Sequence, residues 1–206
     1  MPRATQRFRN MTAVYFSGFG FANESALFAA PPSAVYECLD MRECDVVGFS
    51  YGAQKAVRHA LQSTRPIRRL CLLSPAFFHT MPTRRKEAEI RLFAANPTRY
   101  LQAFLQQALS GDTDASTAQK ELVSPYFCLA APESIQSDTL GDDLRKLLFY
   151  TFCADELAQI RARGIEIEVF LGAKDRIVSA TEARDFFAPL ATRIFWVQGA
   201  GHLLLL

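Results

Sequence analysis

The feature that most constrains this chain is the pentapeptide Gly48 to Gly52, which reads G-F-S-Y-G and has the spacing G-x-S-x-G. It follows the apolar pair Val46-Val47 directly and precedes a segment with helical character, residues 53–62. A serine between a strand and a helix lies in a sharp, strained turn, and the flanking glycines let the helix pack closely against the strand. The pattern therefore predicts a nucleophile elbow that presents the hydroxyl of Ser50.

A serine nucleophile needs a base and an acid, and both candidates follow it along the chain. Asp175 comes after the strand-like run 167–172, and His202 comes after a second run, 194–197. Serine, acid and histidine in this order, each at the end of a strand, are typical of one large class of hydrolases. The sequence thus predicts Ser50, Asp175 and His202 as catalytic residues.

His202 as the base and Asp175 as the acid each have an alternative. His59 belongs to the helix behind the elbow, and His79 precedes the acid, so neither fits the required order. The alternative for Asp175 is an ordinary surface turn between Gly172 and Arg176.

An oxyanion intermediate needs two fixed hydrogen-bond donors. The backbone N–H of Tyr51 is one by its place after the nucleophile, and that of Phe19, in the turn after the first strand, is the natural second. Gly18 and Gly20 flank Phe19, which suits a backbone that approaches the substrate closely.

Strand and helix patterns alternate along the chain, which favours a mostly parallel sheet of about five to six strands with helices on both faces. A single domain over residues 11–206 accounts for the length, and residues 1–10 are an N-terminal extension that precedes a second candidate start, Met11. Residues 34–39 are ambiguous between strand and helix. The strands expected with most support are 14–16, 45–49, 70–73, 167–172 and 194–197.

Residues 79–163 interrupt the strand pattern and are predicted to form a helical lid. Helices are expected over 84–95 and 144–161, and between them Asn96-Pro97 is predicted to cap and begin a third. Four lid phenylalanines are candidates for an acyl pocket: Phe93, Phe104, Phe149 and Phe152.

Composition excludes several other functions. A net charge of +2 is too weak to indicate nucleic-acid binding. Five cysteines without C-x-x-C spacing favour reduced thiols in a cytoplasmic protein over disulfides or a metal site. No apolar run approaches the 18 or so residues that span a bilayer, so we expect neither membrane nor metal nor cofactor.

Five segments together resemble a known family. They are F-S-G-F-G-F at 16–21, N-E-S at 23–25, G-F-S-Y-G-A at 48–53, I-E-V-F-L-G at 167–172 with Asp175, and H-L-L at 202–204. In these the chain is similar to the BioV type of pimeloyl-acyl-carrier-protein methyl ester esterase, a compact α/β-hydrolase of Helicobacter-like bacteria. The resemblance covers most of the chain from Met11 onward, although the lid matches only in helical character.

The resemblance implies a specific reaction and a partner. The enzyme would hydrolyse the methyl ester of a pimeloyl chain held by acyl carrier protein on its phosphopantetheine arm, as a step of biotin synthesis. Carrier proteins of this kind are acidic, and basic lid residues would steer one. The candidates are Arg84, Arg85, Arg91, Arg145 and Lys146; a solvated helix face is the alternative.

Two functions of other kinds stay open. One is a broad-specificity esterase for short free esters, with the same three catalytic residues. The other is a binding protein that keeps the hydrolase fold without catalysis.

Overall fold

The centre of the molecule is a five-stranded sheet that is parallel throughout, with its strands side by side in chain order. The computed structural model describes residues 13–36, 39, 42, 44–110, 117–130 and 137–206; the predicted extension at 1–10 lies outside them. The strands are β1 Val14–Phe16, β2 Asp45–Phe49, β3 Arg69–Leu73, β4 Glu166–Gly172 and β5 Arg193–Val197. The predicted small parallel sheet, and with it the α/β-hydrolase fold, is confirmed.

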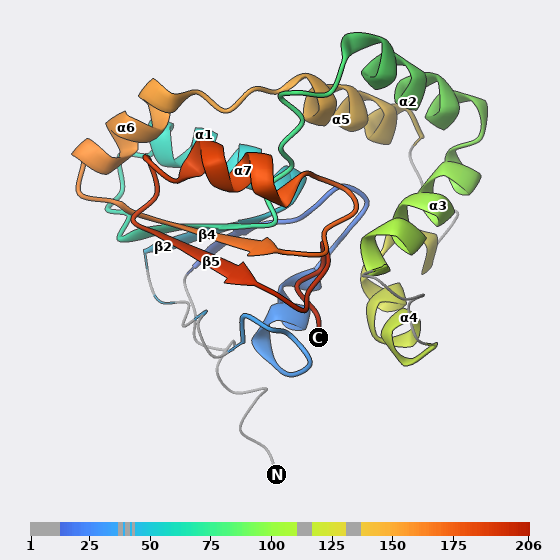
Figure 1. Cartoon of the computed structure of the whole chain (residues 1–206), viewed down its shortest axis with the longest axis horizontal. Helices are drawn as coiled ribbons and strands as arrows, with labels where there is room; N and C mark the ends of the chain where they lie inside the picture. The colour runs from blue at the N-terminus through green and yellow to red at the C-terminus, as the bar shows by residue number, and fades with distance from the viewer. Residues whose placement is uncertain (1–12, 37–38, 40–41, 43, 111–116, 131–136) are drawn as a thin grey trace.

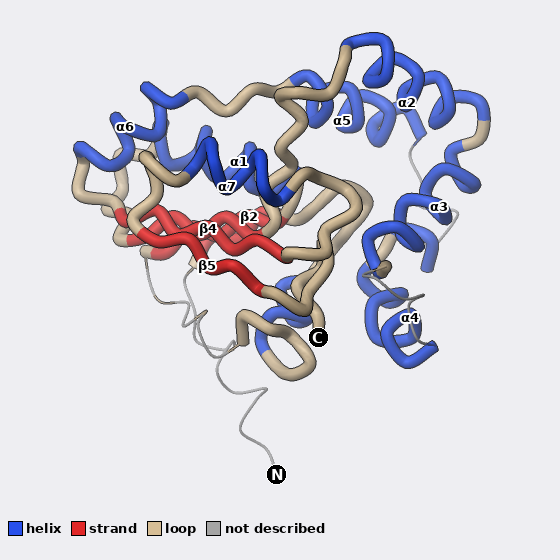
Figure 2. Tube along the Cα trace, in the orientation of Figure 1, coloured by secondary structure: helices blue, strands red, loops and turns tan. Residues whose placement is uncertain are grey.

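Each face of the sheet has its own cover. Helices α1 (Tyr51–Gln62), α6 (Ala154–Ala162) and α7 (Ala180–Phe187) lie over one face, while the 3-10 helix η1 (Glu24–Ala29) and the C-terminal residues lie on the other (Figure 1 and Figure 2). Side chains alternate between these layers along each strand. In β3, Leu70 and Leu72 pack under the α-helices, whereas Cys71 and Leu73 join the opposite cluster.

A helical excursion separates β3 from β4. It contains α2 (Thr83–Ala95), α3 (Pro97–Leu109), α4 (Thr117–Val123), η2 (Ser124–Tyr126), η3 (Cys128–Ala130) and α5 (Ser137–Phe149). Figure 1 shows α2 to α5 standing beside the sheet, with α2 and α5 packed together, whereas α6 returns to the layer over the sheet. The predicted cap at the start of α3 is confirmed, because the Asn96 side chain accepts the N–H of Arg99 at 2.9 Å.

The single helix predicted over 144–161 is wrong, because α5 ends at Phe149 and α6 begins at Ala154. Between them the backbone N–H of Phe152 donates to Nε2 of His79 at 2.8 Å instead of to a helix carbonyl. The Phe152 ring is buried against Phe77 and Phe187. A tertiary contact therefore interrupts a pattern that is locally helical.

The ambiguous segment 34–39 forms neither a strand nor a helix in those of its residues that the structure describes. Its start is instead tied to the C-terminus, since Ser33 pairs with Leu205 and the N–H of Ala34 donates to the carbonyl of Leu204.

An ion network crosses the sheet near the amino ends of the strands. Arg69 of β3 reaches Asp45 of β2 at 3.0 Å and Glu168 of β4 at 2.8 Å, and all three side chains are buried. Arg193 of β5 forms an ion pair with the other carboxylate oxygen of Glu168 at 2.5 Å. Charges buried in this way must be paired, since an isolated one would cost several kcal/mol.

Candidate active site

Ser50 lies in the sharp turn between β2 and α1 with φ 52° and ψ −114°, a conformation that side-chain-bearing residues rarely adopt. The neighbouring glycines are required for close packing. A Cβ on Gly48 would lie 2.4 Å from the carbonyl oxygen of Gly52, and one on Gly52 would lie 1.9 Å from the carbonyl oxygen of Phe16. The predicted elbow conformation is thus present, with α1 in backbone contact with the end of β1.

The three predicted catalytic side chains lie together at the carboxyl edge of the sheet. Nε2 of His202 is 2.9 Å from the hydroxyl of Ser50, and Nδ1 is 2.7 Å from Oδ2 of Asp175. The other carboxylate oxygen of Asp175 accepts the backbone N–H groups of Ile177 at 2.8 Å and Val178 at 3.1 Å. These two bonds fix the carboxylate where it can orient the imidazole.

This chain of hydrogen bonds defines what the site can do chemically. A carboxylate at Nδ1 holds the proton of His202 on that nitrogen and leaves Nε2 free to accept a proton from Ser50. His202 is fully buried and Ser50 is 3% exposed, so little water competes for these bonds. Buried electrostatic contacts are stronger than exposed ones.

The segment that carries His202 is held by close backbone packing. A Cβ on Gly172, at the end of β4, would lie 2.2 Å from the carbonyl oxygen of Gly201. The ring of Phe49 packs 5.4 Å from the imidazole, and the three leucines that directly follow His202, Leu203 to Leu205, are buried. The strand ends therefore bring acid, base and nucleophile to one place.

Neither of the two predicted oxyanion donors is taken up by another residue that the structure describes. The backbone N–H of Phe19 and that of Tyr51 donate to no other described residue. Gly20 has φ 72°, which turns the chain sharply just after Phe19. Free N–H groups in buried backbone are rare, so an oxygen supplied by a substrate would satisfy them.

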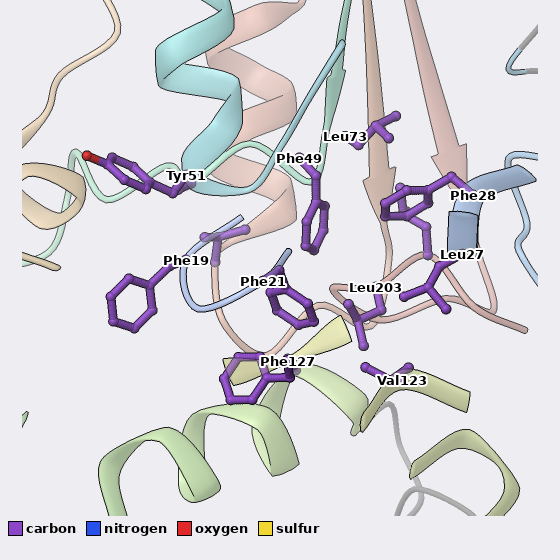
Figure 3. Close-up of a cluster of buried hydrophobic side chains, with 14 of the residues drawn as sticks. Phe19, Phe21, Leu27, Phe28, Phe49, Tyr51, Leu73, Val123, Phe127 and Leu203 are labelled. Carbon is purple, nitrogen blue, oxygen red and sulfur yellow. The ribbon is translucent and has the colours of Figure 1, made fainter. Parts of the chain in front are cut away.

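Aromatic side chains close over this end of the sheet. Figure 3 shows Phe21, Phe49 and Phe127 gathered in one buried cluster, with Phe19 beside it. Two of the predicted acyl-pocket residues join it, because the ring of Phe19 forms edge-to-face pairs with Phe104 and Phe93, with ring centres 5.6 Å and 6.3 Å apart.

The other two predicted acyl-pocket residues lie elsewhere. Phe149 is 42% exposed and packs under the ammonium group of Lys86, which lies 5.5 Å from the ring centre. Phe152 is buried in the cluster on the opposite face of the sheet. Neither joins the cluster around Phe19, because Phe149, the last residue of α5, faces solvent and Phe152 lies beyond the end of that helix.

Contacts between α5 and the elbow helix were not predicted from the sequence. The hydroxyl of Tyr51 donates to Asp143 at 3.1 Å, and Lys55 lies 3.7 Å from the same carboxylate. The amide of Gln54 donates to the carbonyl of Leu147 at 3.0 Å. The partners are about 90 residues apart, so no local pattern marks them.

All five basic residues predicted to meet a carrier protein are exposed, on the adjacent helices α2 and α5. Arg84 and Arg85 lie in the first turn of α2, whereas Lys146 lies in the last turn of α5 and Arg145 directly before it. Arg91 is paired with Glu87 at 4.0 Å.

A cavity of about 550 Å³ adjoins the turn that carries Phe19. It is lined by Gly18 and Gly20, by Lys55 and Asp143 at the contact of α1 with α5, and by Tyr126 of η2. Ser50 and His202 do not line it.

In the described part of the chain, no cluster of three or more histidine, cysteine or acidic side chains could hold a metal ion. Among the helices that the structure describes, none has the length and apolar character needed to cross a bilayer.

Comparison with known proteins gives one family match. The model of the "Alpha/beta hydrolase family" matches residues 16–206. Among curated proteins, comparison finds no match.

Solved structures with the same fold are numerous, and three illustrate the range. A hydrolase from Oleispira antarctica, olei00960, superposes with a TM-score of 0.66 at 15% identity, over 95% of this chain and 85% of that one. The carboxylesterase CesB from Bacillus subtilis gives 0.59 at 15%, over 95% and 79%. BioG from Haemophilus influenzae gives 0.55 at 16%, over 93% and 88%. At these identities the likeness is one of fold.

Proposed function

The chain belongs to the alpha/beta hydrolase family, and we propose that it is a serine esterase in which Ser50, His202 and Asp175 hydrolyse a carboxylic ester. The observation that carries the proposal is the continuous hydrogen-bonded chain from the Ser50 hydroxyl through both ring nitrogens of His202 to Asp175. Its geometry suits general-base activation of a hydroxyl nucleophile.

In the acylation half of the reaction, the hydroxyl of Ser50 attacks the ester carbonyl carbon while Nε2 of His202 takes its proton. The C–O bond to the alcohol breaks as His202 returns that proton to the leaving oxygen. Asp175 stabilises the imidazolium between these transfers. The products are an acyl-Ser50 intermediate and a free alcohol.

The negative charge of each tetrahedral intermediate lies on the former carbonyl oxygen. The N–H groups of Phe19 and Tyr51 bind it, and one such donor typically contributes about 10²–10³-fold in rate. In deacylation a water molecule attacks the acyl group, again with His202 as base, and Ser50 is regenerated with release of the carboxylic acid.

For the substrate, we infer the methyl ester of a pimeloyl chain on acyl carrier protein, with methanol as the leaving alcohol. Two features support this. The motif resemblance includes the F-S-G-F-G-F segment at 16–21 as well as the elbow. The basic residues of α2 and α5 form an exposed surface suited to an acidic partner.

Helices α2 to α5 act as the lid in this proposal. Phe93 and Phe104 lie against Phe19 and would line the path of the acyl chain. Because Ser50 is almost fully buried, a substrate must displace part of this aromatic cover to reach it.

The test compares three substrates at matched concentrations: carrier-bound methyl pimeloyl ester, free dimethyl pimelate and a short p-nitrophenyl ester. A kcat/KM for the carrier-bound ester well above both others supports the proposal. Equal values for all three identify a broad-specificity esterase. Absence of hydrolysis, together with failure of a fluorophosphonate to label Ser50, identifies a non-catalytic binding protein.

A further inference from the structure

A buried carboxyl group lies beside the turn that carries Phe19. Glu24, the first residue of η1, is fully buried, and its Oε1 accepts the backbone N–H of Gly18 at 2.8 Å and the hydroxyl of Tyr15 at 3.1 Å. Burying an acidic side chain costs folding free energy, because the group loses its contacts with water. The mechanism above assigns this group no role.

The bond with Glu24 fixes the peptide between Ser17 and Gly18, which is next to the peptide that carries the N–H of Phe19. The carbonyl of Gly18 accepts the N–H of Phe21 at 3.2 Å, so Gly18 is held at both its N–H and its C=O. That carbonyl and the N–H of Phe19 belong to one planar trans peptide and point in opposite directions. Holding Gly18 therefore aims the N–H of Phe19, which donates to no other described residue.

The other backbone bonds of the turn come after Phe19: the carbonyl of Gly20 accepts the N–H of Cys128 at 2.8 Å, and the N–H of Ala22 donates to the carbonyl of Tyr126 at 2.9 Å. Strand β1 ends at Phe16, so sheet pairing does not extend to Gly18. Glycine must stand at 18, because a Cβ there would lie 2.8 Å from the ring of Phe49. Glycine also brings conformational freedom that would blur the position of a hydrogen-bond donor.

We propose that Glu24 is a positioning residue for the oxyanion hole: it clamps the N–H of Gly18 and thereby holds the N–H of Phe19 toward the reacting carbonyl. The role rests on the proposed esterase function and adds a residue to that site. It requires an acceptor of the length of glutamate. It does not require a negative charge, and burial raises the pKa of Glu24, which favours the uncharged acid.

The experiment uses Glu24→Met, which keeps the size but removes the acceptor, and Glu24→Gln, which keeps both. On a soluble p-nitrophenyl ester, Glu24→Met is expected to lower kcat about 10²-fold, as loss of an oxyanion donor does, with KM within about threefold of wild type. Glu24→Gln is expected to retain most of the activity. Tyr15→Phe removes the other donor to the same oxygen and is expected to change kcat less than about threefold.

A trifluoromethyl ketone, which forms a tetrahedral adduct with the serine, gives the second readout. Its inhibition constant should rise by the same factor as kcat falls in Glu24→Met, and stay near wild type in Glu24→Gln. If Glu24→Met does not fold, Glu24→Asp replaces it, since a shorter carboxyl keeps the acid but withdraws the acceptor from Gly18.

Three results would overturn the inference. One is wild-type kcat and ketone affinity in Glu24→Met, which would leave the esterase function standing. Another is an equal loss in Glu24→Met, Glu24→Gln and Tyr15→Phe with lowered melting temperatures, which would mark Glu24 as a structural residue only. A wild-type protein that neither hydrolyses esters nor reacts at Ser50 would overturn the proposed function and this role together.

Discussion

The hydroxyl of Tyr51 donates a hydrogen bond of 3.1 Å to Asp143, which lies 92 residues further along the chain on α5. Burial and the nearby carboxylate raise the pKa of Tyr51, so the phenol stays a donor. The same residue supplies a backbone N–H to the proposed oxyanion hole. One residue therefore links the proposed lid to the proposed active site.

Tyr51→Phe should loosen α5 without abolishing hydrolysis of a small ester, because the backbone N–H remains. Losing one hydrogen bond of about 1 kcal/mol would speed amide exchange in α5 about fivefold. Hydrogen exchange followed by mass spectrometry measures this. Tyr36→Phe is the control, since the Tyr36 hydroxyl bonds to no described residue, and equal exchange in both variants would contradict the link.

Ser50→Ala should lower ester hydrolysis by about 10⁴-fold or more, because the hydroxyl is the attacking group. Steady-state kinetics and thermal unfolding measure activity and folding. Ser74→Ala is a matched control: Ser74 also follows a strand with positive φ, but its buried hydroxyl has no hydrogen-bond partner within the described part of the chain. A tenth of wild-type activity in Ser50→Ala would exclude Ser50 as the nucleophile.

Asp175→Asn should reduce kcat by up to about 10⁴-fold with little change in melting temperature. The amide oxygen can still accept the N–H groups of Ile177 and Val178, but an NH₂ group facing Nδ1 favours the unproductive tautomer of His202. Asp185→Asn, at an exposed ion pair with Arg184, serves as the control. Equal activity in the two variants would assign the acid to another residue.

Acid should weaken the connection between the two ends of the lid. The imidazole of His79 accepts the N–H of Phe152, which requires a neutral ring, and burial, with a contribution from Lys86, lowers the pKa of His79 below 6.5. Its contribution to stability is therefore complete above pH 6.5 and is lost as the pH falls through the lowered value, since the unfolded chain binds the proton first.

Urea unfolding of wild type and His79→Gln at pH 7.5, 6.5 and 5.5 isolates this effect, because all other titrating groups are shared. The free energy of unfolding should fall more steeply with acid in wild type. Parallel curves would show that His79 makes no pH-dependent contribution.

Reversing the charge of basic lid residues should weaken hydrolysis of the carrier-bound substrate and leave that of small esters unchanged. Arg84→Glu with Arg85→Glu is expected to raise KM for that ester roughly tenfold or more and to leave kcat for a p-nitrophenyl ester nearly unchanged, because these charges act on encounter. Arg91→Glu should matter less, since Arg91 is already paired with Glu87.

Arg65→Glu, an exposed change near the amino ends of the strands, controls for net charge. Equal losses on both substrates would indicate a damaged lid. No loss on either would make these residues an ordinary solvated surface.

Elements set by local backbone demands could be predicted from the sequence. The G-x-S-x-G spacing marks a turn in which the glycines at 48 and 52 are sterically required, and this is how the structure uses them. Asp175 and His202 were identifiable because the ends of parallel strands meet at one edge of a sheet.

Features that depend on distant partners could not be predicted in this way. Helical periodicity continues through Phe152, and only the bond to His79, 73 residues earlier, shows why α5 stops. The same applies to Phe149, whose exposure depends on how α5 docks. Glu24 reads as an ordinary polar residue until its burial and its bond to Gly18 are seen.

The ion network at the amino ends of the strands has a consequence for how the sheet is assembled. A one-residue slip of β3 would turn Arg69 to the other face, into the apolar layer under α1, and remove its ion pairs with Asp45 and Glu168. A two-residue slip would separate the charges by about 7 Å. Misaligned sheets thus carry an electrostatic penalty far from the elbow, and the same alignment that pairs the charges brings the strand ends beneath Ser50 and His202 level with each other.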